Sequence, residues 1–252
     1  DEVLFRQELA ALQASGLLDR ADGATPFSAA NFVVVPYCTG DLFVGEAVRD
    51  YSVGVSTRTV HHVGGNNVRA VLADLAERFP ATRQIWLTGV SAGGYGALFS
   101  YELVAAAFPE ARVDVLVDGS PLIEPTGGLL GTWRSQWQAQ QPDCAGCDTS
   151  LAAVAASLHA AHPDRRFALL TSQNDEVIRS YFGYGLTDIT PQIDALAADE
   201  YDQAQAHAFV VPGTEHVLLG GYRTRSGPNG SLLRDFVDGW AHGDERFVTV
   251  RP

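Results

Sequence analysis

Short apolar runs alternate along the chain with segments of helical periodicity. Five of these runs are rich in β-branched and aromatic residues, and each is bounded by turn residues. Their apolar positions follow one another without alternation, which is typical of strands that are buried on both faces. We therefore predict five strands, at residues 32–37, 84–90, 113–118, 167–172 and 208–212.

Apolar residues spaced three and four positions apart predict helices between these strands. Such spacing is found at 68–79, 98–108, 151–158 and 232–240, and more weakly through residues 1–20. Strands that alternate with helices predict an α/β fold, in which helices cover both faces of a mostly parallel sheet. No repeat and no flexible linker divides the chain, so we expect residues 1–252 to form one domain. Residues 120–150 lack a clear period and predict an irregular insertion on the sheet.

Composition excludes several classes of protein. The content of 46% hydrophobic and 10% aromatic residues argues against a disordered chain. The net charge of −13 and the scattered arginines argue against a nucleic-acid binder. No apolar run approaches the ~20 residues of a membrane span. Because the chain contains no methionine, we expect a segment upstream of Asp1 that would include any secretion signal.

The motif Gly89-Val90-Ser91-Ala92-Gly93 carries the strongest chemical signal. It lies directly after the strand predicted at 84–90 and directly before a helix. This setting is typical of the nucleophile elbow of an α/β hydrolase, where small residues allow a sharp turn that presents the serine hydroxyl. We predict Ser91 as a nucleophile and the amide of Ala92 as a donor to the oxyanion. A glycine-rich turn without chemistry is the alternative.

A nucleophilic serine needs a base and an acid that orients the base, and in this fold they follow the serine in the order acid, then histidine. Asp175 follows the strand at 167–172 and His216 follows the strand at 208–212, so both belong to the same sheet edge as Ser91. We predict Asp175 as the acid and His216 as the base. Asp118, which ends the strand at 113–118, is the alternative acid, or else a buried structural carboxylate. The other histidines lack the order or the loop context: His61, His62, His159, His162, His207 and His242.

The three cysteines are too few for a disulfide scaffold. Cys144 and Cys147 form a lone CxxC, which lacks the other ligands of a zinc site and the setting of a redox pair. A local disulfide in an exported protein is the interpretation we favour. Cys38 is then free and buried, or paired with a group that this chain does not contain. We expect no metal or other cofactor.

Several motifs occur in the order of a known enzyme family. They are Val35-Pro36-Tyr37-Cys38-Thr39-Gly40-Asp41, Gly64-x-x-Asn67, the serine elbow through Gly96, Asp118-Gly119-Ser120, the Trp and Cys of residues 133–147, the Asp175 loop leading to Tyr181-Phe182, and Gly213-Thr214-Glu215-His216. Over residues 31–220 the chain resembles the pectin acetylesterase and Notum family of serine carboxylic-ester hydrolases, in its bacterial branch. The resemblance implies that Ser91, Asp175 and His216 are nucleophile, acid and base. It also implies a secreted or periplasmic enzyme that works without a metal.

Two features depart from the family's pattern. Its Gly-Gly-x-Trp-Cys loop, which supplies an oxyanion donor, is absent from this sequence, so we expect this loop and the N-terminal strands of the fold upstream of Asp1. The segment His61-His62-Val63-Gly64-Gly65 is similar to the oxyanion loop of esterases. It follows the strand at 32–37 instead of preceding it, which favours a turn and helix cap. The second departure from the family's pattern is Val217, which stands where relatives often carry a cysteine.

The reaction that these residues predict is transfer of an acyl group to water through an acyl-serine. We expect a deacylase or acetylesterase that acts on acylated polysaccharide. The alternatives are a broader esterase that cleaves polyesters and a catalytically silent binding module. Aromatic side chains are candidates for the substrate pocket, with core packing as the alternative for each: Phe43, Trp133, Trp137, Tyr181, Phe182 and Tyr184.

Overall fold

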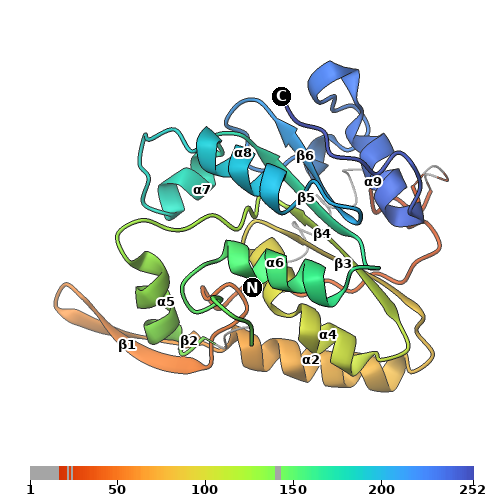
Figure 1. Cartoon of the computed structure of the whole chain (residues 1–252). Helices are drawn as coiled ribbons and strands as arrows, with labels where there is room; N and C mark the ends of the chain where they lie inside the picture. The colour runs from red at the N-terminus through yellow and green to blue at the C-terminus, as the bar shows by residue number, and fades with distance from the viewer. Residues whose placement is uncertain (1–16, 22, 24, 140–142) are drawn as a thin grey trace.

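Four parallel strands form the central sheet of the computed structural model, which describes residues 17–21, 23, 25–139 and 143–252 (Figure 1). Four of the five predicted strands are confirmed, and the helix expected through residues 1–20 lies almost wholly outside the described residues. The strands stand in the order β3 (Gln84–Val90), β4 (Arg112–Asp118), β5 (Phe167–Ser172) and β6 (Ala206–Val211). Since all four run parallel, their carboxyl ends lie at one edge of the sheet.

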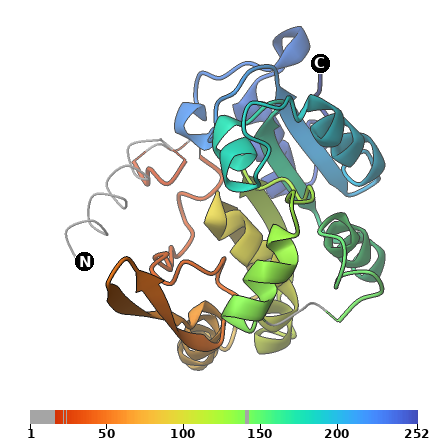
Figure 2. The ribbon, with the colours of Figure 1, turned by 90° about the vertical axis from the view of Figure 1, so that its left-hand side faces the viewer.

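Helices cover both faces of this sheet, which confirms the predicted α/β class (Figures 1 and 2). Alternate residues of β4 belong to different core clusters: Val115 packs on one face and Leu116 on the other, as the period of a strand requires. The second face packs mainly against α9 (Leu233–His242). The first face packs against α3 (Ala92–Phe99), α4 (Tyr101–Ala107), α6 (Ala152–Ala161), α7 (Glu176–Tyr181) and α8 (Thr190–Asp199), with α2 (Gly64–Arg78) beside α4.

The strand predicted at residues 32–37 is wrong. These residues belong to no strand, and Val33 and Tyr37 have 51% and 41% of their surface exposed. Within the described part of the chain, β3 is the last strand on its side of the sheet. An apolar run becomes a buried strand only where another backbone pairs with it, and the composition of the run does not supply that partner.

Two further expectations about local structure need correction. The single helix expected at 98–108 is two helices, because Ser100 ends α3 and begins α4 with φ −95° and ψ 1°. The insertion at 120–150 is not wholly irregular, since it contains α5 (Leu129–Trp137). This helix packs against a hairpin that the sequence did not predict, formed by β1 (Ala47–Val53) and β2 (Ser56–His62).

The cysteines divide as the sequence suggested. Cys144 and Cys147 form a disulfide just before α6, so the predicted local bridge is confirmed. Cys38 is not disulfide-bonded, but its side chain is exposed and not buried as expected. No helix in the described residues combines the length and the apolar character of a membrane span.

A buried histidine on α6 makes stability depend on pH. The ring of His159 packs against those of Phe167 and Tyr201, with centroids 4.7 and 5.1 Å away. Burial lowers the pKa of His159 to about 4, against a smaller opposing effect of the Glu200 backbone. The unfolded chain therefore binds this proton more tightly than the folded chain does, and acid favours unfolding.

We expect His159→Leu to reduce the acid sensitivity of the protein. In the wild type, this histidine lowers the free energy of unfolding by up to about 1.4 kcal/mol for each pH unit below 6.5, until the pH reaches about 4. Urea unfolding at pH 7 and pH 5 measures the difference. His61→Gln, a change at an exposed position in β2, is the control and should keep the wild-type dependence. An equal pH dependence in His159→Leu would contradict the assignment.

Candidate active site

Ser91 lies at the turn between β3 and α3 in a backbone conformation that residues other than glycine rarely adopt. Its φ is 54° and its ψ is −124°. Positive φ at a residue other than glycine is strained and persists only where the surroundings hold it. Here the amide of Ser91 donates to the carbonyl of Asp118 at 2.8 Å, and the amide of Gly94 donates to the carbonyl of Ser91 at 2.9 Å. The strand-turn-helix setting predicted for the elbow is present.

The turn is so tight that position 89, the first glycine of the motif, has no room for a side chain. A Cβ added to Gly89 would lie 2.1 Å from the carbonyl oxygen of Gly93, whereas a Cβ on Gly93 would meet no atom within 4 Å. The backbone before the serine therefore passes directly against the backbone after it. Ala92 begins α3, and its amide precedes the first intrahelical hydrogen bond. The N-terminus of α3 thus lies beside Ser91, as an oxyanion donor would require.

The imidazole of His216 is hydrogen bonded to Asp175. Nδ1 of the ring donates to Oδ2 at 2.8 Å and to Oδ1 at 3.0 Å. Asp175 is fully buried, whereas 18% of the His216 side chain is exposed. The same carboxylate caps α7 by accepting from the amides of Val177 and Ile178, each at 3.0 Å. With Nδ1 as the donor, Nε2 of His216 carries a lone pair, and Nε2 has no hydrogen-bond partner among the described residues.

Backbone hydrogen bonds join the two loops that carry this pair. The amide of Asn174 donates to the carbonyl of Gly213 at 3.0 Å, and the amide of Glu176 donates to that of Thr214 at 3.1 Å. The loop after β5 and the loop after β6 are therefore fixed to each other on both sides of Asp175. This pairing places acid and imidazole at the carboxyl edge of the sheet, the edge from which Ser91 also leaves.

Asp118, the alternative acid, makes different contacts. Its buried carboxylate accepts from the amides of Leu218 and Leu219, at 2.7 to 3.0 Å. Burial raises the pKa of Asp118 to about 7, and the bonds from the two amides act in the opposite direction. The ring nitrogen Nδ1 of His216 is bound by Asp175 instead. The contacts therefore favour Asp175 as the orienting acid and the structural interpretation of Asp118.

Asp41 holds the loop before β1 together, a role that the sequence did not indicate. This buried carboxylate accepts hydrogen bonds from the Thr39 hydroxyl at 2.6 Å and from the amides of Phe43, Gly45 and Gly64 at 3.1, 3.2 and 2.7 Å. Two residues of the loop it holds, Leu42 and Phe43, have positive φ. Its only sequence signal is the Gly-Asp pair that closes the Tyr-Cys motif.

The segment His61-His62-Val63-Gly64-Gly65 has a structural setting. It ends β2 and begins α2, whose first residue, Gly64, lies before the helical spacing that the sequence shows from residue 68. The ring of His62 is buried and lies at hydrogen-bond distance from the Thr39 carbonyl and the Tyr51 hydroxyl, at 3.0 and 2.8 Å. These contacts fit the turn-and-helix-start interpretation of the segment.

Comparison with known proteins finds one family model and a solved fold that are similar to this chain. The sequence model of the pectinacetylesterases matches residues 7–126, a range that includes the serine elbow. Two crystal forms of the Wnt deacylase Notum from Drosophila are similar in fold, with TM-scores of 0.63 and 0.64 at 16% sequence identity. The alignments cover 90% and 91% of this chain and 72% and 74% of the Notum chains. The first half of the chain is thus similar to the pectinacetylesterases, and the fold is similar to that of Notum.

Similarity to the pectinacetylesterase model supports an esterase or deacylase. No curated protein matches the chain. The range matched by the pectinacetylesterase model ends before Asp175 and His216, so their assignment depends on the contacts described above. Placement in the bacterial branch stays a prediction. In the residues that the structure describes, no three His, Cys, Asp or Glu side chains come together as a possible metal site.

The aromatic residues proposed for the substrate pocket have unequal settings. Phe182 is 3% exposed and packs against the rings of Tyr95 and Trp133, so core packing explains it. Tyr181 is 73% exposed.

Trp133 and Trp137 are half-buried and stack on each other along α5, with their ring centroids 5.6 Å apart. The Tyr184 hydroxyl donates to the Glu124 carbonyl at 2.7 Å, and the Phe43 ring lies directly over Gly96 of α3.

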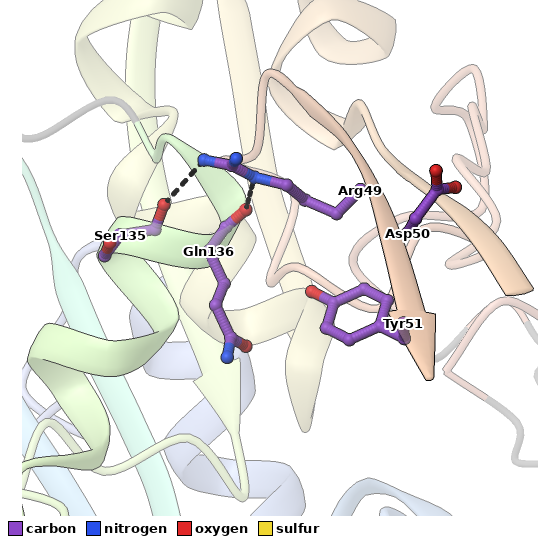
Figure 3. Close-up of a pocket in the computed structure, with 5 residues that line it drawn as sticks. All are labelled: Arg49, Asp50, Tyr51, Ser135 and Gln136. Carbon is purple, nitrogen blue, oxygen red and sulfur yellow. Dashed lines mark hydrogen bonds between the residues drawn. The ribbon is translucent and has the colours of Figure 1, made fainter. Parts of the chain in front are cut away.

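A pocket of ≈ 380 Å³ opens between the hairpin and α5 (Figure 3). Its lining residues are Arg49, Asp50, Tyr51, Ser135 and Gln136. The guanidinium of Arg49 crosses from β1 and donates to the carbonyls of Gln136 at 3.2 Å and Ser135 at 3.3 Å (Figure 3). These bonds join the hairpin to α5, and the pocket includes none of the residues predicted for catalysis.

The elbow geometry predicts a contrast between two neighbouring glycines. Gly89→Ala should destabilise the protein by about 1–3 kcal/mol, because the new methyl group collides with the backbone of Gly93. Gly93→Ala has free space and should leave stability unchanged or raise it by up to about 1 kcal/mol, since alanine favours the helix. Chemical denaturation of both variants measures the difference, and equal stability of Gly89→Ala and wild type would contradict the geometry.

Proposed function

We propose that the protein is a serine carboxylic-ester hydrolase that removes acyl groups from an acylated carbohydrate. In this proposal Ser91 is the nucleophile, His216 the general base and Asp175 the acid that orients it. The observation that carries the proposal is the hydrogen bond from His216 Nδ1 to buried Asp175, with Nε2 left unpartnered on the edge where Ser91 lies. A histidine held in this way is prepared to accept a proton at Nε2.

The proposed reaction has two halves. His216 Nε2 takes the proton of the Ser91 hydroxyl, and the serine oxygen attacks the ester carbonyl to form a tetrahedral oxyanion. His216 then protonates the leaving alcohol, and the acyl group remains on Ser91. Water, activated by the same nitrogen, attacks the acyl-serine and releases the acid. The carboxylate of Asp175 keeps the proton on Nδ1 and stabilises the imidazolium that forms in each half.

Stabilisation of the oxyanion is assigned to the N-terminus of α3. The amide of Ala92 lies at its first position, where helix amides have no intrahelical acceptor and the helix dipole is positive. Loss of one such donor typically slows acyl transfer by ~10²–10³. Export from the cytoplasm is part of the proposal, because the Cys144–Cys147 disulfide is a bond that oxidising compartments maintain.

Substitutions in the proposed triad test its roles. Ser91→Ala should abolish turnover of a short-chain nitrophenyl ester. Asp175→Asn should lower kcat by about 10⁴-fold, since an amide favours the wrong imidazole tautomer. The exposed neighbour change Glu176→Gln is the control and should leave turnover unchanged. Thermal unfolding of each variant shows whether the fold persists, because Asp175 also caps α7. Turnover that survives in Ser91→Ala would refute the nucleophile assignment.

The substrate class is tested by comparing two esters. We expect release of acetate from a soluble acetylated sugar, and little release of monomer from a polyester film. Both reactions are followed by acid release at equal enzyme concentration, with Ser91→Ala as the blank. Faster hydrolysis of the film would replace the carbohydrate deacylase with a broader polyester hydrolase. No hydrolysis of any ester would leave a silent binding module.

A further inference from the structure

A single turn after β4 lies between the proposed nucleophile and the proposed base. Ser91 follows β3, and His216 follows β6, three strands away in the sheet order. The loop with His216 must therefore pass over the end of β4 to reach the serine. The residues found there are Asp118, which ends β4, and the Gly119-Ser120 pair that follows it.

On one side, this turn holds the serine elbow. The carbonyl of Asp118 accepts from the Ser91 amide at 2.8 Å. The hydroxyl of Ser120 donates to the Ser91 carbonyl at 2.7 Å and lies 3.1 Å from the Asp118 carbonyl. Both backbone polar groups of the strained serine are thus bonded to the turn, which is how a positive φ at Ser91 is maintained.

On the other side, the same turn holds the histidine loop. The Asp118 carboxylate accepts from the amide of Leu218 at 2.9 and 3.0 Å and from that of Leu219 at 2.7 Å, across 100 residues of sequence. Gly119 has φ +62°, and a Cβ there would lie 2.3 Å from the His216 carbonyl and 3.2 Å from its ring. The base therefore rests directly on the backbone of the turn.

We propose that the Asp118-Gly119-Ser120 turn is a positioning element, in which Asp118 fixes the loop of His216 and Ser120 fixes the elbow of Ser91. The inference rests on the proposed function. Asp118 is a positioning residue and not a catalytic one, because its oxygens bind backbone amides two and three residues beyond the base. A carboxylate with no exposed surface is unfavourable unless donors satisfy it, so these amides and this side chain require each other.

Asp118→Ala tests the link to the base. Loss of the acceptor should let the 216–219 loop shift, and a misplacement of ~1 Å lowers kcat by about 10²-fold while KM changes little. Asp118→Asn keeps one oxygen that can face both amides, and it should retain kcat within about ten-fold of the wild type. Turnover of a nitrophenyl ester gives kcat and KM, and circular dichroism gives the folded fraction.

Asp114→Ala is the matched control. Asp114 lies on the same strand, four residues before Asp118, and is equally buried. Its carboxylate binds Arg112 and Arg166 instead of the loop of His216. Its replacement should lower stability yet leave kcat per folded molecule unchanged. The inference is overturned if Asp118→Ala keeps wild-type kcat, if Asp118→Asn loses as much as Asp118→Ala, or if Asp114→Ala loses kcat equally.

Ser120→Ala tests the other side of the turn, and it can be measured even if Asp118→Ala does not fold. It removes only the hydroxyl that holds the Ser91 carbonyl, and kcat should fall about ten-fold for a shift well under 1 Å. Ser172→Ala is its control, because that buried hydroxyl ends β5 without a hydrogen-bond partner in the described residues. If Ser120→Ala and Ser172→Ala have equal kcat, the role of Ser120 fails.

Different results contradict the positioning role and the proposed function. If Ser91→Ala abolishes turnover while Asp118→Ala and Ser120→Ala keep it, only the positioning role is wrong. If the wild type hydrolyses no ester, or Ser91→Ala turns over as fast as the wild type, the proposed function itself is wrong.

Discussion

The hydrogen bond between His216 and the buried carboxylate of Asp175 is the interaction on which the rest of the site depends. Asp175 has no exposed surface, and such a carboxylate is stable only when donors surround it. Two helix amides and the Nδ1–H group supply these donors. Because the carboxylate is fixed at the start of α7, it also fixes the imidazole, and Nε2 has no hydrogen-bond partner in the described residues. The proposed function assigns the proton transfer to this nitrogen.

The parallel sheet explains how residues far apart in sequence meet there. Every strand from β3 to β6 ends at the same edge, so the loops that follow them form one surface (Figure 2). The turn after β4 lies between the outer loops and bonds to both. Strain at Ser91 and burial at Asp118 are unfavourable features taken singly. Both are relieved through the same turn: the Asp118 carbonyl accepts from the Ser91 amide, and the amides of Leu218 and Leu219 satisfy the Asp118 carboxylate.

Much of this architecture could be predicted from local patterns, and the remainder depends on distant partners. The strands at β3 to β6 and the loops with Ser91, Asp175 and His216 follow from continuous apolar runs and the residues behind them. The run at 32–37 has the same composition but lacks a neighbouring strand. The contact of Asp118 with amides 100 residues away has no local signature at all. Nor does the packing of α5 on the hairpin, which uses backbone carbonyls that any sequence carries.

The most direct test measures where, and how fast, a fluorophosphonate modifies the protein. We expect one phosphonyl adduct, which peptide mass spectrometry finds on the peptide that contains Ser91. In His216→Ala the rate of adduct formation should be lower by a factor of ~10³, because the hydroxyl then has no base. An adduct on another residue, or equal rates in wild type and His216→Ala, would contradict the claim that His216 activates Ser91.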